Sequence, residues 1–351
     1  MYIGQRGDSL GDVPANHPAI DESYTVRAGK FRRYHGDGLK QLIDVPTIAK
    51  NMRDGSRVLV GLAESRRLLK KIKPDLVFIK GGFVGVPVGL AAAQLHIPIV
   101  THDSDVIPGL ANRIIARWAT AHAVALPKEM YAYPQEKTYT VGVPISAAFA
   151  PVTVSLQAQY KQELGLEHYA HVLLVTGGGN GAWGLNQLLY NIAPSILKRD
   201  PEVCIVLLSG RKFEAAVSAS FDTVLSPSDR QRVIVKGFVD DLYRWSGAAD
   251  VIIARGSATN IAEFAAQEKT CIMIPAAQLI WTVKNTDALA KAGAVKAFLE
   301  KDVLLDSKPL IDCCVQLCTN LQERKTYAHK LRQFAHPQAT HDLAMLLLSL
   351  G

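Results

Sequence analysis

Short apolar runs recur along most of this chain, and segments of helix length separate them. The runs are "LVFI", "IPIV", "HVLLV", "VCIVLL", "RVIV", "DVIIA" and "TCIMI". Each run has the length of a buried strand, and strands that alternate with helices in this way indicate a parallel, doubly wound sheet. One group of runs ends before about Val143 and the other begins at about His171. The pattern therefore predicts two Rossmann-like domains.

The segment between the two groups, "PISAAFAPVTVSLQAQYKQELGL", carries two prolines and no strand-like core. It is typical of a linker followed by the first helix of a second domain. We expect one domain at 1–146 and another at 147–351, with a C-terminal helix that can return to the first domain. Ligands of such sheets bind at the carboxyl ends of the strands, so a cleft between the domains is the expected site.

The stretch "HVLLVTGGGNGAWGLNQLLYNIAPSIL" joins a predicted strand, a glycine loop and a predicted helix. Apolar residues recur there at three- and four-residue steps from Leu185, as on one face of a helix. Glycines let backbone amides approach a ligand, and the free amides of a first helical turn favour an anion. A phosphate site is one interpretation of this loop, and a plain tight turn is the other.

A further junction, "ADVIIARGSATNIAEFAAQ", places hydroxyls and amides at the start of a predicted helix. Ser257 and Thr259 suit a phosphate, and the Glu263 carboxylate can accept two hydrogen bonds from a ribose diol. This pattern is typical of nucleotide binding. The alternative is an N-cap followed by a glutamate that faces solvent.

Composition narrows the class of protein. The 351 residues are 48% hydrophobic and 20% charged, which is typical of a globular protein, and the formal charge of +7 suggests an anionic partner. No apolar run has the roughly twenty residues that span a bilayer, and the first ten residues show no signal-peptide pattern, so we expect a cytoplasmic protein. The five cysteines lack the spacing of a zinc site and are expected to be reduced.

Five segments together resemble the MurG family, whose members transfer N-acetylglucosamine from UDP-GlcNAc to lipid I and so form lipid II in peptidoglycan synthesis. They are "KPDLVFIKGGFVGVPVGLAA", "THDSDVIPGLANRIIARWA", "LLVTGGGNGAWGLNQ", "GFVDDLYRWSGAADVIIARGSATNIAEFAA" and "NTDALAKAGAVKAF". The resemblance implies a GT-B fold, an inverting hexosyltransferase and no metal or other cofactor. It also implies that the second domain binds the donor and that the first binds the acceptor.

By the same resemblance, Phe238 and Val239 would lie beside uracil, Glu263 would hold the ribose, and the loop at Gly177–Gly181 would stand over the diphosphate and sugar. The implied donor-binding residues are Gly178, Gly179, Asn180, Gly181, Phe238, Val239, Arg255, Ser257, Ala258, Thr259, Asn260, Glu263, Thr282 and Asn285. The implied acceptor-binding residues are Gly81, Gly82, Phe83 and Asp105.

Catalysis needs a base for the acceptor hydroxyl and stabilisation of the departing diphosphate. Arg255 and the helix starts are candidates for the stabilisation. His102 and Asp105 are the candidates for the base. Two structural roles compete with these: His102 can order the end of its strand, and Asp105 can cap the following helix.

The chain also departs from the family pattern. It starts at "MYIGQRGD", which resembles the strand after the family's first glycine loop, so that strand, that loop and its proposed basic histidine have no counterpart. The loss of a central strand would leave an unpaired sheet edge. Positions that usually hold Arg, Ser, Asn and Gln in the family are Ser146, Gly179, Asp105 and Thr282 here. We therefore expect donor recognition with impaired turnover.

Residues 27–73 carry thirteen Lys and Arg against four acidic residues, a net charge that exceeds the surplus of the whole chain. The apolar residues Leu39, Leu42, Ile43, Val45 and Ile48 lie among these bases. Such a segment favours anionic headgroups by about 1 kcal/mol per charge near the surface, which predicts peripheral binding at the cytoplasmic face of the plasma membrane. A solvated helix face is the alternative.

Other functions remain open at this stage. A transferase for another UDP-sugar and lipid-linked acceptor would fit the substitutions at Gly179 and Thr282. A donor-binding protein with impaired catalysis would fit the departure at the N-terminus. Nucleic acid is not an expected partner, because the basic segment has few aromatic residues and no recognition motif.

Overall fold

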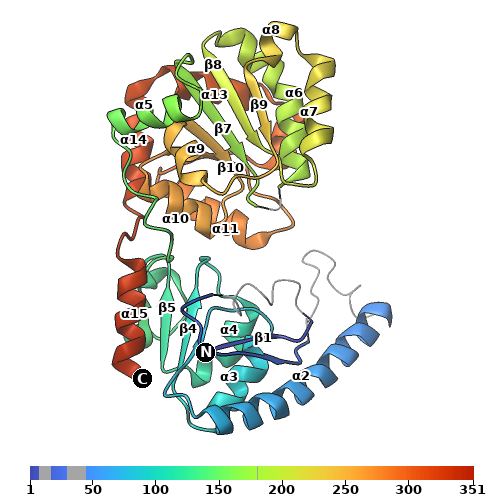
Figure 1. The fold of residues 1–351 in the computed structure, drawn as a ribbon, viewed down its shortest axis with the longest axis vertical. Helices are drawn as coiled ribbons and strands as arrows, with labels where there is room; N and C mark the ends of the chain where they lie inside the picture. Colours follow the sequence, from blue (N-terminus) through green and yellow to red (C-terminus); the bar gives the residue numbers. More distant parts are fainter. Residues whose placement is uncertain (8–16, 30–44, 180) are drawn as a thin grey trace. The chain divides into compact units, whose positions relative to one another are not determined.

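The computed structural model describes residues 1–7, 17–29, 45–179 and 181–351, and it describes the side chains of the helix that begins at Val45 only from Asp54 onward. The described chain divides into two compact units, coloured along the sequence in Figure 1. The first unit comprises Met1–Gly142 and Thr340–Gly351, and the second comprises Val143–Ala339. The chain thus leaves the first unit four residues before the predicted boundary, and its last twelve residues belong to that unit. The cleft expected between the two domains stays a prediction.

The first unit contains two parallel sheets. A pair of strands comprises β1 (Tyr2–Gln5) and β2 (Ser23–Val26), and a four-stranded sheet has the order β3-β4-β5-β6. The strands of the larger sheet are β3 (Val77–Ile79), β4 (Ile99–Asp103), β5 (Ala121–Val124) and β6 (Thr138–Thr140). The α-helices between the strands are α2 (Val45–Ile72), α3 (Gly85–Gln94) and α4 (Leu110–Ile115). Short 3-10 turns follow at Ala116–Trp118, Lys128–Met130 and Gln135–Lys137.

No hydrogen-bonded pairing joins the two sheets among the described strands of the first unit. Among the described residues, β1 pairs with β2 alone and β3 pairs with β4 alone. A cavity of about 680 Å³ is lined by side chains of β1 and β3 and by Leu69 and Ile72 of α2. This agrees with the expectation of an unpaired strand edge in the first domain.

The last helix, α15 (Ala339–Leu350), packs against the larger sheet of the first unit. Its Leu343 is buried with Val100 of β4 and Ala121 of β5, and three further leucines of α15 pack against the same cluster. The apolar residues of α15 lie three and four positions apart, so one face of the helix covers the sheet. The first unit is therefore built from both ends of the chain.

The second unit contains one parallel six-stranded sheet of order β12-β11-β10-β7-β8-β9. Its strands are β7 (His171–Thr176), β8 (Val203–Leu208), β9 (Val233–Lys236), β10 (Val251–Ala254), β11 (Thr270–Met273) and β12 (Lys296–Ala297). Its helices are α5 (Val154–Glu163), α6 (Trp183–Arg199), α7 (Glu214–Val224), α8 (Pro227–Arg230), α9 (Leu242–Ala248), α10 (Ala258–Ala266), α11 (Ile280–Lys291), α12 (Glu300–Leu305), α13 (Lys308–Thr319) and α14 (Leu321–Arg332). The predicted alternation of strands and helices is confirmed.

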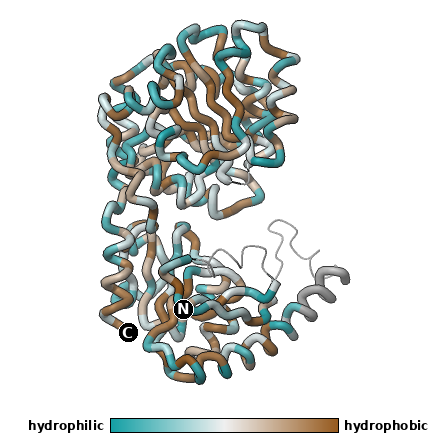
Figure 2. Tube along the Cα trace, in the orientation of Figure 1, coloured by the Kyte–Doolittle hydropathy of each residue, from teal (hydrophilic) through white to brown (hydrophobic). Residues whose placement is uncertain are grey.

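Helices cover both faces of this sheet. Alternate residues of β7 point to opposite faces: Leu173 joins a core with α6 and α13, and Leu174 joins a core with α9 and α10. Figure 2 shows the strands of the second unit as its most hydrophobic part, with mixed colour on the surrounding helices. All five cysteines are free and buried, and burial raises the pKa of the Cys204 thiol to about 12. They are packing residues, as the sequence predicts.

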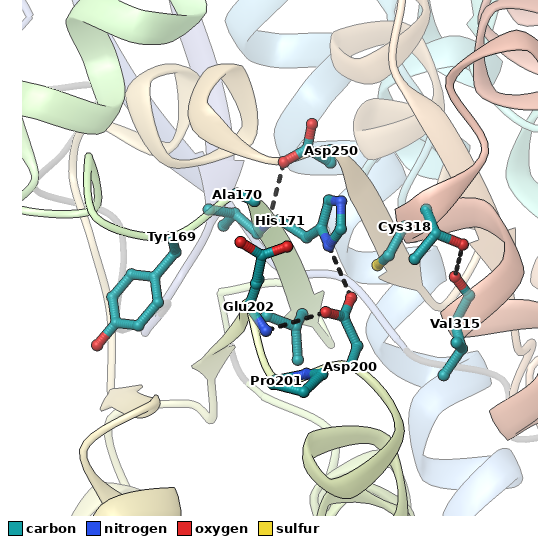
Figure 3. Close-up of polar contacts among 12 residues, drawn as sticks. Tyr169, Ala170, His171, Asp200, Pro201, Glu202, Asp250, Val315 and Cys318 are labelled. Carbon is teal, nitrogen blue, oxygen red and sulfur yellow. Dashed lines mark hydrogen bonds and ion pairs between the residues drawn. The ribbon is translucent and has the colours of Figure 1, made fainter.

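Polar contacts hold the amino-terminal end of β7 (Figure 3). His171 Nδ1 lies 2.7 Å from Asp200 Oδ2, and the Val172 N–H donates to Asp250 Oδ2 at 2.9 Å. The Asp250 carboxylate also accepts from Lys161 Nζ at 3.0 Å. These contacts stabilise the amino end of β7. The loops described below lie at the opposite, carboxyl end of the strand. No helix in the described part of the chain is both long and apolar enough to cross a bilayer.

Candidate functional site

The glycine loop after β7 follows a tight path that only glycine permits at several positions. Gly178 and Gly181 have φ angles of 84° and 72°, and the Gly181 N–H donates to the Gly178 carbonyl at 2.9 Å. A Cβ at Gly181 would lie 2.1 Å from the Ser209 carbonyl oxygen. Gly179 is exposed and a Cβ there would only touch the Phe238 ring at 3.6 Å. The loop is a tight turn that leaves one glycine open to solvent, and Asn180 lies outside the described residues.

A chain of hydrogen bonds runs along the first turns of α10. The Ser257 side chain caps the helix by accepting the Asn260 N–H, and its hydroxyl donates to Asn260 Oδ1 at 2.9 Å. The Asn260 side-chain amide in turn donates to Glu263 Oε2 at 3.0 Å. Burial raises the pKa of Glu263, and the bond from Asn260 opposes that shift. Glu263 is thus half-buried and held in one orientation by Asn260, and its contact with a ribose stays a prediction.

These two loops converge with the end of β9 at one edge of the sheet. A Cβ at Gly178 would lie 3.9 Å from Asn260 Oδ1, and a Cβ at Gly179 would lie 3.6 Å from the Phe238 ring. Thr259 is exposed on the first turn of α10, beside the half-buried Ala258. The structure therefore brings the predicted diphosphate, uracil and ribose residues together within the second unit.

Phe238 has a neighbour that sequence reasoning missed. The Arg211 guanidinium lies 3.9 Å from the centre of the Phe238 ring, a cation–π contact, while Val239 packs against the core. Arg211 follows the Ser209–Gly210 turn after β8. An arginine directly after a strand and a glycine is the signal that could have singled it out.

Thr282 and Asn285 lie behind the start of α10. Both are buried: the Asn285 side-chain amide donates to the Gly256 carbonyl at 3.2 Å, and the Thr282 hydroxyl donates to the Leu279 carbonyl at 2.8 Å. A Cβ at Gly256, whose φ is 75°, would lie 2.4 Å from Thr286 Oγ1. These contacts hold the loop, and a direct contact of Thr282 or Asn285 with a donor sugar stays a prediction.

Arg255 is buried and bound to protein groups. Its Nη1 donates to the Ile274 carbonyl at 3.1 Å and its Nη2 lies 2.8 Å from Glu300 Oε1. The side chain is 10% exposed. A direct contact with the donor phosphates, as predicted for Arg255, stays a prediction, and its two protein contacts indicate a different task that is considered below.

On the acceptor side, Gly81 and Gly82 follow β3 with φ angles of 105° and 80°, which require glycine. A Cβ at either would meet no atom within 4 Å. Both glycines and Phe83 line the 680 Å³ cavity of the first unit. Three of the four predicted acceptor-binding residues thus lie at an open loop beside that cavity, and the fourth, Asp105, lies in the loop after β4.

His102 is completely buried, and its Nε2 lies 2.9 Å from the Gly142 carbonyl oxygen. Because a carbonyl oxygen only accepts, the Nε2 carries the proton in this contact. Burial lowers the pKa of the His102 imidazole. This geometry matches the ordering role that the sequence left open for His102. Asp105 is half-buried in the loop that follows.

Asp103 supports the loop after β4, a role that the sequence analysis did not assign to it. Its carboxylate, 5% exposed, accepts from the Gly109 N–H at 3.0 Å, from Asn112 Nδ2 at 2.9 Å and from the Tyr133 hydroxyl at 2.9 Å. The bonds to Gly109 and Asn112 close the loop that carries Asp105. An acidic residue at the end of a buried strand, six residues before a Pro-Gly turn, is the signal in the sequence.

The basic segment is only partly described. Leu39, Leu42 and Ile43 lie outside the described residues, as do the side chains of Val45 and Ile48. Farther along α2, Leu59 is 70% exposed and Val60 is 40% exposed, close to Arg57, which is also exposed. The described part of α2 therefore presents apolar and basic side chains to its surroundings.

Comparison with known proteins gives the family. Residues 29–124 match the glycosyltransferase family 28 N-terminal domain, and residues 172–343 match the glycosyltransferase family 28 C-terminal domain. The UDP-N-acetylglucosamine--N-acetylmuramyl-(pentapeptide) pyrophosphoryl-undecaprenol N-acetylglucosamine transferase of Lachnoclostridium phytofermentans is 30% identical to this chain, and the alignment covers 92% of the chain and 83% of the relative. The chain belongs to the MurG family.

Two further comparisons agree with this assignment. The transferase of the same name from Lachnospira eligens is 34% identical over 72% of the chain and 64% of that relative. The crystal structure of Acinetobacter baumannii MurG matches with a TM-score of 0.70 at 21% identity, covering 99% of this chain and 90% of that one. The MurG-family fold is GT-B, so the predicted fold class is confirmed, and the predicted class of enzyme, a glycosyltransferase, is that of the family.

Proposed function

We propose that this chain transfers N-acetylglucosamine from UDP-GlcNAc to the undecaprenyl-linked acceptor lipid I, with inversion at the anomeric carbon, and so forms lipid II. One observation carries the proposal. In a chain of the MurG family, the exposed glycine at 179, the aromatic ring of Phe238 and the first turns of α10 converge at the carboxyl edge of one sheet. That edge offers amides for a diphosphate, a ring for a base and a carboxylate for a ribose.

The donor's parts match the groups at this edge. The amides of Ala258 and Thr259, at the positive end of the α10 dipole, face the diphosphate and oppose the charge that develops when it departs. Glu263, held by Asn260, accepts the ribose hydroxyls, and the Phe238–Arg211 pair lies beside the uracil. Donor binding depends on the second unit alone.

The transfer breaks the bond between the anomeric carbon and the phosphate oxygen and forms a bond from that carbon to the acceptor oxygen. The acceptor hydroxyl loses its proton to a base in the first unit. Asp105 is the stronger candidate, because His102 is fully buried and bound to the Gly142 carbonyl. Gly81, Gly82 and Phe83 contact the acceptor.

The acceptor is a membrane lipid, so the enzyme works as a peripheral protein at the cytoplasmic face of the plasma membrane. The exposed Leu59 and Val60 and the basic residues around them support this placement. Binding to vesicles that contain anionic lipid, and its loss at high salt, tests it. Equal binding to neutral vesicles would contradict an electrostatic attachment.

The central experiment measures UDP binding by calorimetry and product formation with a lipid I analogue. We expect UDP and UDP-GlcNAc to bind and UDP-GlcNAc to be preferred over UDP-glucose and UDP-N-acetylgalactosamine. No heat with UDP at millimolar concentration would overturn the proposal. A preference for another sugar would favour a transferase that uses a different UDP-sugar.

One observation favours a donor-binding protein with impaired catalysis as the second candidate. The described strands of the first unit form two separate sheets, with a cavity beside Gly81 and Phe83 at the predicted acceptor side. Donor binding without measurable transfer would support this candidate.

A further inference from the structure

Arg255 and Glu300 form an inward-facing ion pair at the carboxyl edge of the second unit. Arg255 directly follows β10, and Glu300 is the first residue of α12. Their side chains are 10% and 18% exposed, and Arg255 Nη2 lies 2.8 Å from Glu300 Oε1. Because so little of either group reaches water, the pair is screened weakly and its geometry is closely defined.

The pair connects loops that are far apart in the sequence. Arg255 Nη1 also donates to the carbonyl of Ile274, the residue after β11, at 3.1 Å. Gly256 and the N-cap Ser257 follow Arg255 directly. One planar guanidinium thus joins the loop that starts α10 to the end of β11 and to the start of α12.

The pair also lies against the first turn of α6, the helix that follows the glycine loop. A Cβ at Gly184 would lie 2.4 Å from Glu300 Oε1 and 3.1 Å from Arg255 Nη2. A side chain at this position would therefore displace the Glu300 carboxylate from its contact with Arg255. A carboxylate beside the first turn of a helix is also favourable for the helix dipole.

We infer that Arg255 and Glu300 are positioning residues, which hold the loops before α6 and α10 in the geometry that binds the donor diphosphate, and that Gly184 is the contact through which the pair sets α6. This inference rests on the proposed function. It assigns Arg255 a role through its neighbours, because its charge is already balanced by Glu300 and two of its donors are engaged.

The substitution Glu300→Gln separates this role from a direct phosphate contact by the sign of its effect. The change keeps the size of the side chain and leaves Arg255 with an unbalanced positive charge. If Arg255 bound the diphosphate directly, the loss of the competing carboxylate would tighten UDP binding. If Arg255 positions the two loops, the weakened pair releases them and UDP binding weakens.

The experiment measures the dissociation constant of UDP by calorimetry, and KM and kcat for UDP-GlcNAc, on the full chain. We expect Glu300→Gln to raise the dissociation constant and KM about tenfold, which corresponds to about 1.4 kcal/mol, with a smaller effect on kcat. Asp312→Asn is the matched control, because it makes the same change at an exposed ion pair with Arg199 and Lys308. It should leave UDP binding unchanged.

Gly184→Ala is the second variant and does not change any charge. Alanine favours a helix more than glycine does, so a loss of UDP affinity in a variant of unchanged melting temperature must come from the contact with the pair. Glu300→Asp, which keeps the charge, should recover part of the affinity that Glu300→Gln loses.

Two outcomes overturn the inference while the proposed function stands: UDP binds the unaltered chain and Glu300→Gln either leaves its affinity unchanged or increases it. If Glu300→Gln does not fold, Gly184→Ala decides, and an unchanged affinity in that variant rejects the inference. Failure of the unaltered chain to bind UDP is a different result, which rejects the proposed function itself.

Discussion

At the scale of single residues, hydrogen bonds and burial determine whether a side chain of the candidate site can contact a ligand. Glu263 is held by Asn260, which is itself held by the N-cap Ser257, so the carboxylate reaches the surface in one orientation. His102 has an imidazole, a group that often acts as a catalytic base. Its burial and its hydrogen bond to the Gly142 carbonyl instead indicate a structural role.

Replacement of Glu263 tests the ribose contact. We expect Glu263→Ala to weaken UDP binding roughly ten- to hundredfold, because two hydrogen bonds to a partly buried carboxylate are lost, together worth about 1–3 kcal/mol. Competition with UDP-GlcNAc, UDP-glucose and UDP should show the same loss for all three, since the ribose is common to them. Glu167→Ala, a change at an exposed glutamate of the same unit, serves as the control. Equal affinity before and after Glu263→Ala would contradict the ribose contact.

His122 makes the stability of the first unit depend on pH. The ring is buried, stacks on Tyr133 at 3.8 Å and bonds to Thr101 Oγ1 at 2.8 Å, and burial lowers the pKa of His122 from 6.5 to about 4. The unfolded chain therefore binds more protons between these values. Neutral His122 therefore does not reduce the free energy of unfolding above pH 6.5. As the pH drops from 6.5 to 4, the free energy of unfolding falls by up to about 3 kcal/mol.

Thermal unfolding between pH 7 and pH 4.5 measures this effect. His122→Gln should flatten the pH dependence whatever it does to the melting temperature at pH 7. The exposed His168 provides the control, and His168→Gln should leave the slope as it is. If the melting temperature of His122→Gln falls with pH as steeply as that of the unaltered chain, groups other than His122 cause the loss of stability in acid.

At the scale of elements, the loops after the strands form the site, and the strands and helices hold them. The position of each loop was readable from the sequence, because an apolar run followed by glycines and a helical pattern indicates a strand, a turn and a helix start. Which glycine serves conformation and which leaves room for a ligand was not readable. That distinction depends on contacts such as the one between Gly181 and the Ser209 carbonyl, which lies on a different strand's loop.

The glycine loop supplies a matched pair of variants. Gly181→Ala forces a side chain into a backbone with φ of 72° and into the Ser209 carbonyl oxygen, so we expect it to lower stability by at least about 1–2 kcal/mol and to weaken UDP binding. Gly179→Ala meets only the Phe238 ring at an ordinary contact distance and should keep the melting temperature. Calorimetry with UDP and thermal unfolding of both variants would check this. Equal melting temperatures would contradict the steric argument.

The sequence singled out most residues of the predicted donor site but fewer of the residues that support its loops. Ser257 and Glu263 stood out because one short stretch holds them, Asn260 was implied by the family resemblance, and the structure joins all three by hydrogen bonds. The support of the loops by Glu300 lies 45 residues away from Arg255, and no local pattern links the two. The contact of Asp103 with Tyr133 likewise joins segments 30 residues apart.

At the scale of the whole molecule, the two units differ in how complete their sheets are. The second unit has six strands in one sheet and a core on each face, whereas the described strands of the first unit form two separate sheets with a cavity beside the predicted acceptor loop. In the proposed function, donor binding needs only the second unit. Transfer also needs the acceptor and a base to be held in place by the first unit.

We therefore expect the 351-residue chain to bind UDP-GlcNAc but to transfer the sugar at least about a hundredfold more slowly than Acinetobacter baumannii MurG under the same conditions, because a poorly positioned base loses its contribution to the rate. Calorimetry for binding and lipid II formation for turnover measure the two halves separately. Comparable turnover by the two enzymes would contradict the prediction. Asp105→Asn would then show whether Asp105 is the base.

The position of α15 has a consequence for the order in which this protein folds during its synthesis. The second unit is one continuous segment and can fold as soon as it leaves the ribosome, but the apolar surface around Val100 and Ala121 waits for Leu343 and its neighbours. At about 5–20 residues per second, that surface stays uncovered for roughly 10–40 s. The N-terminal unit, although made first, is therefore completed last, and during that interval it is the part of the nascent chain that most needs a chaperone.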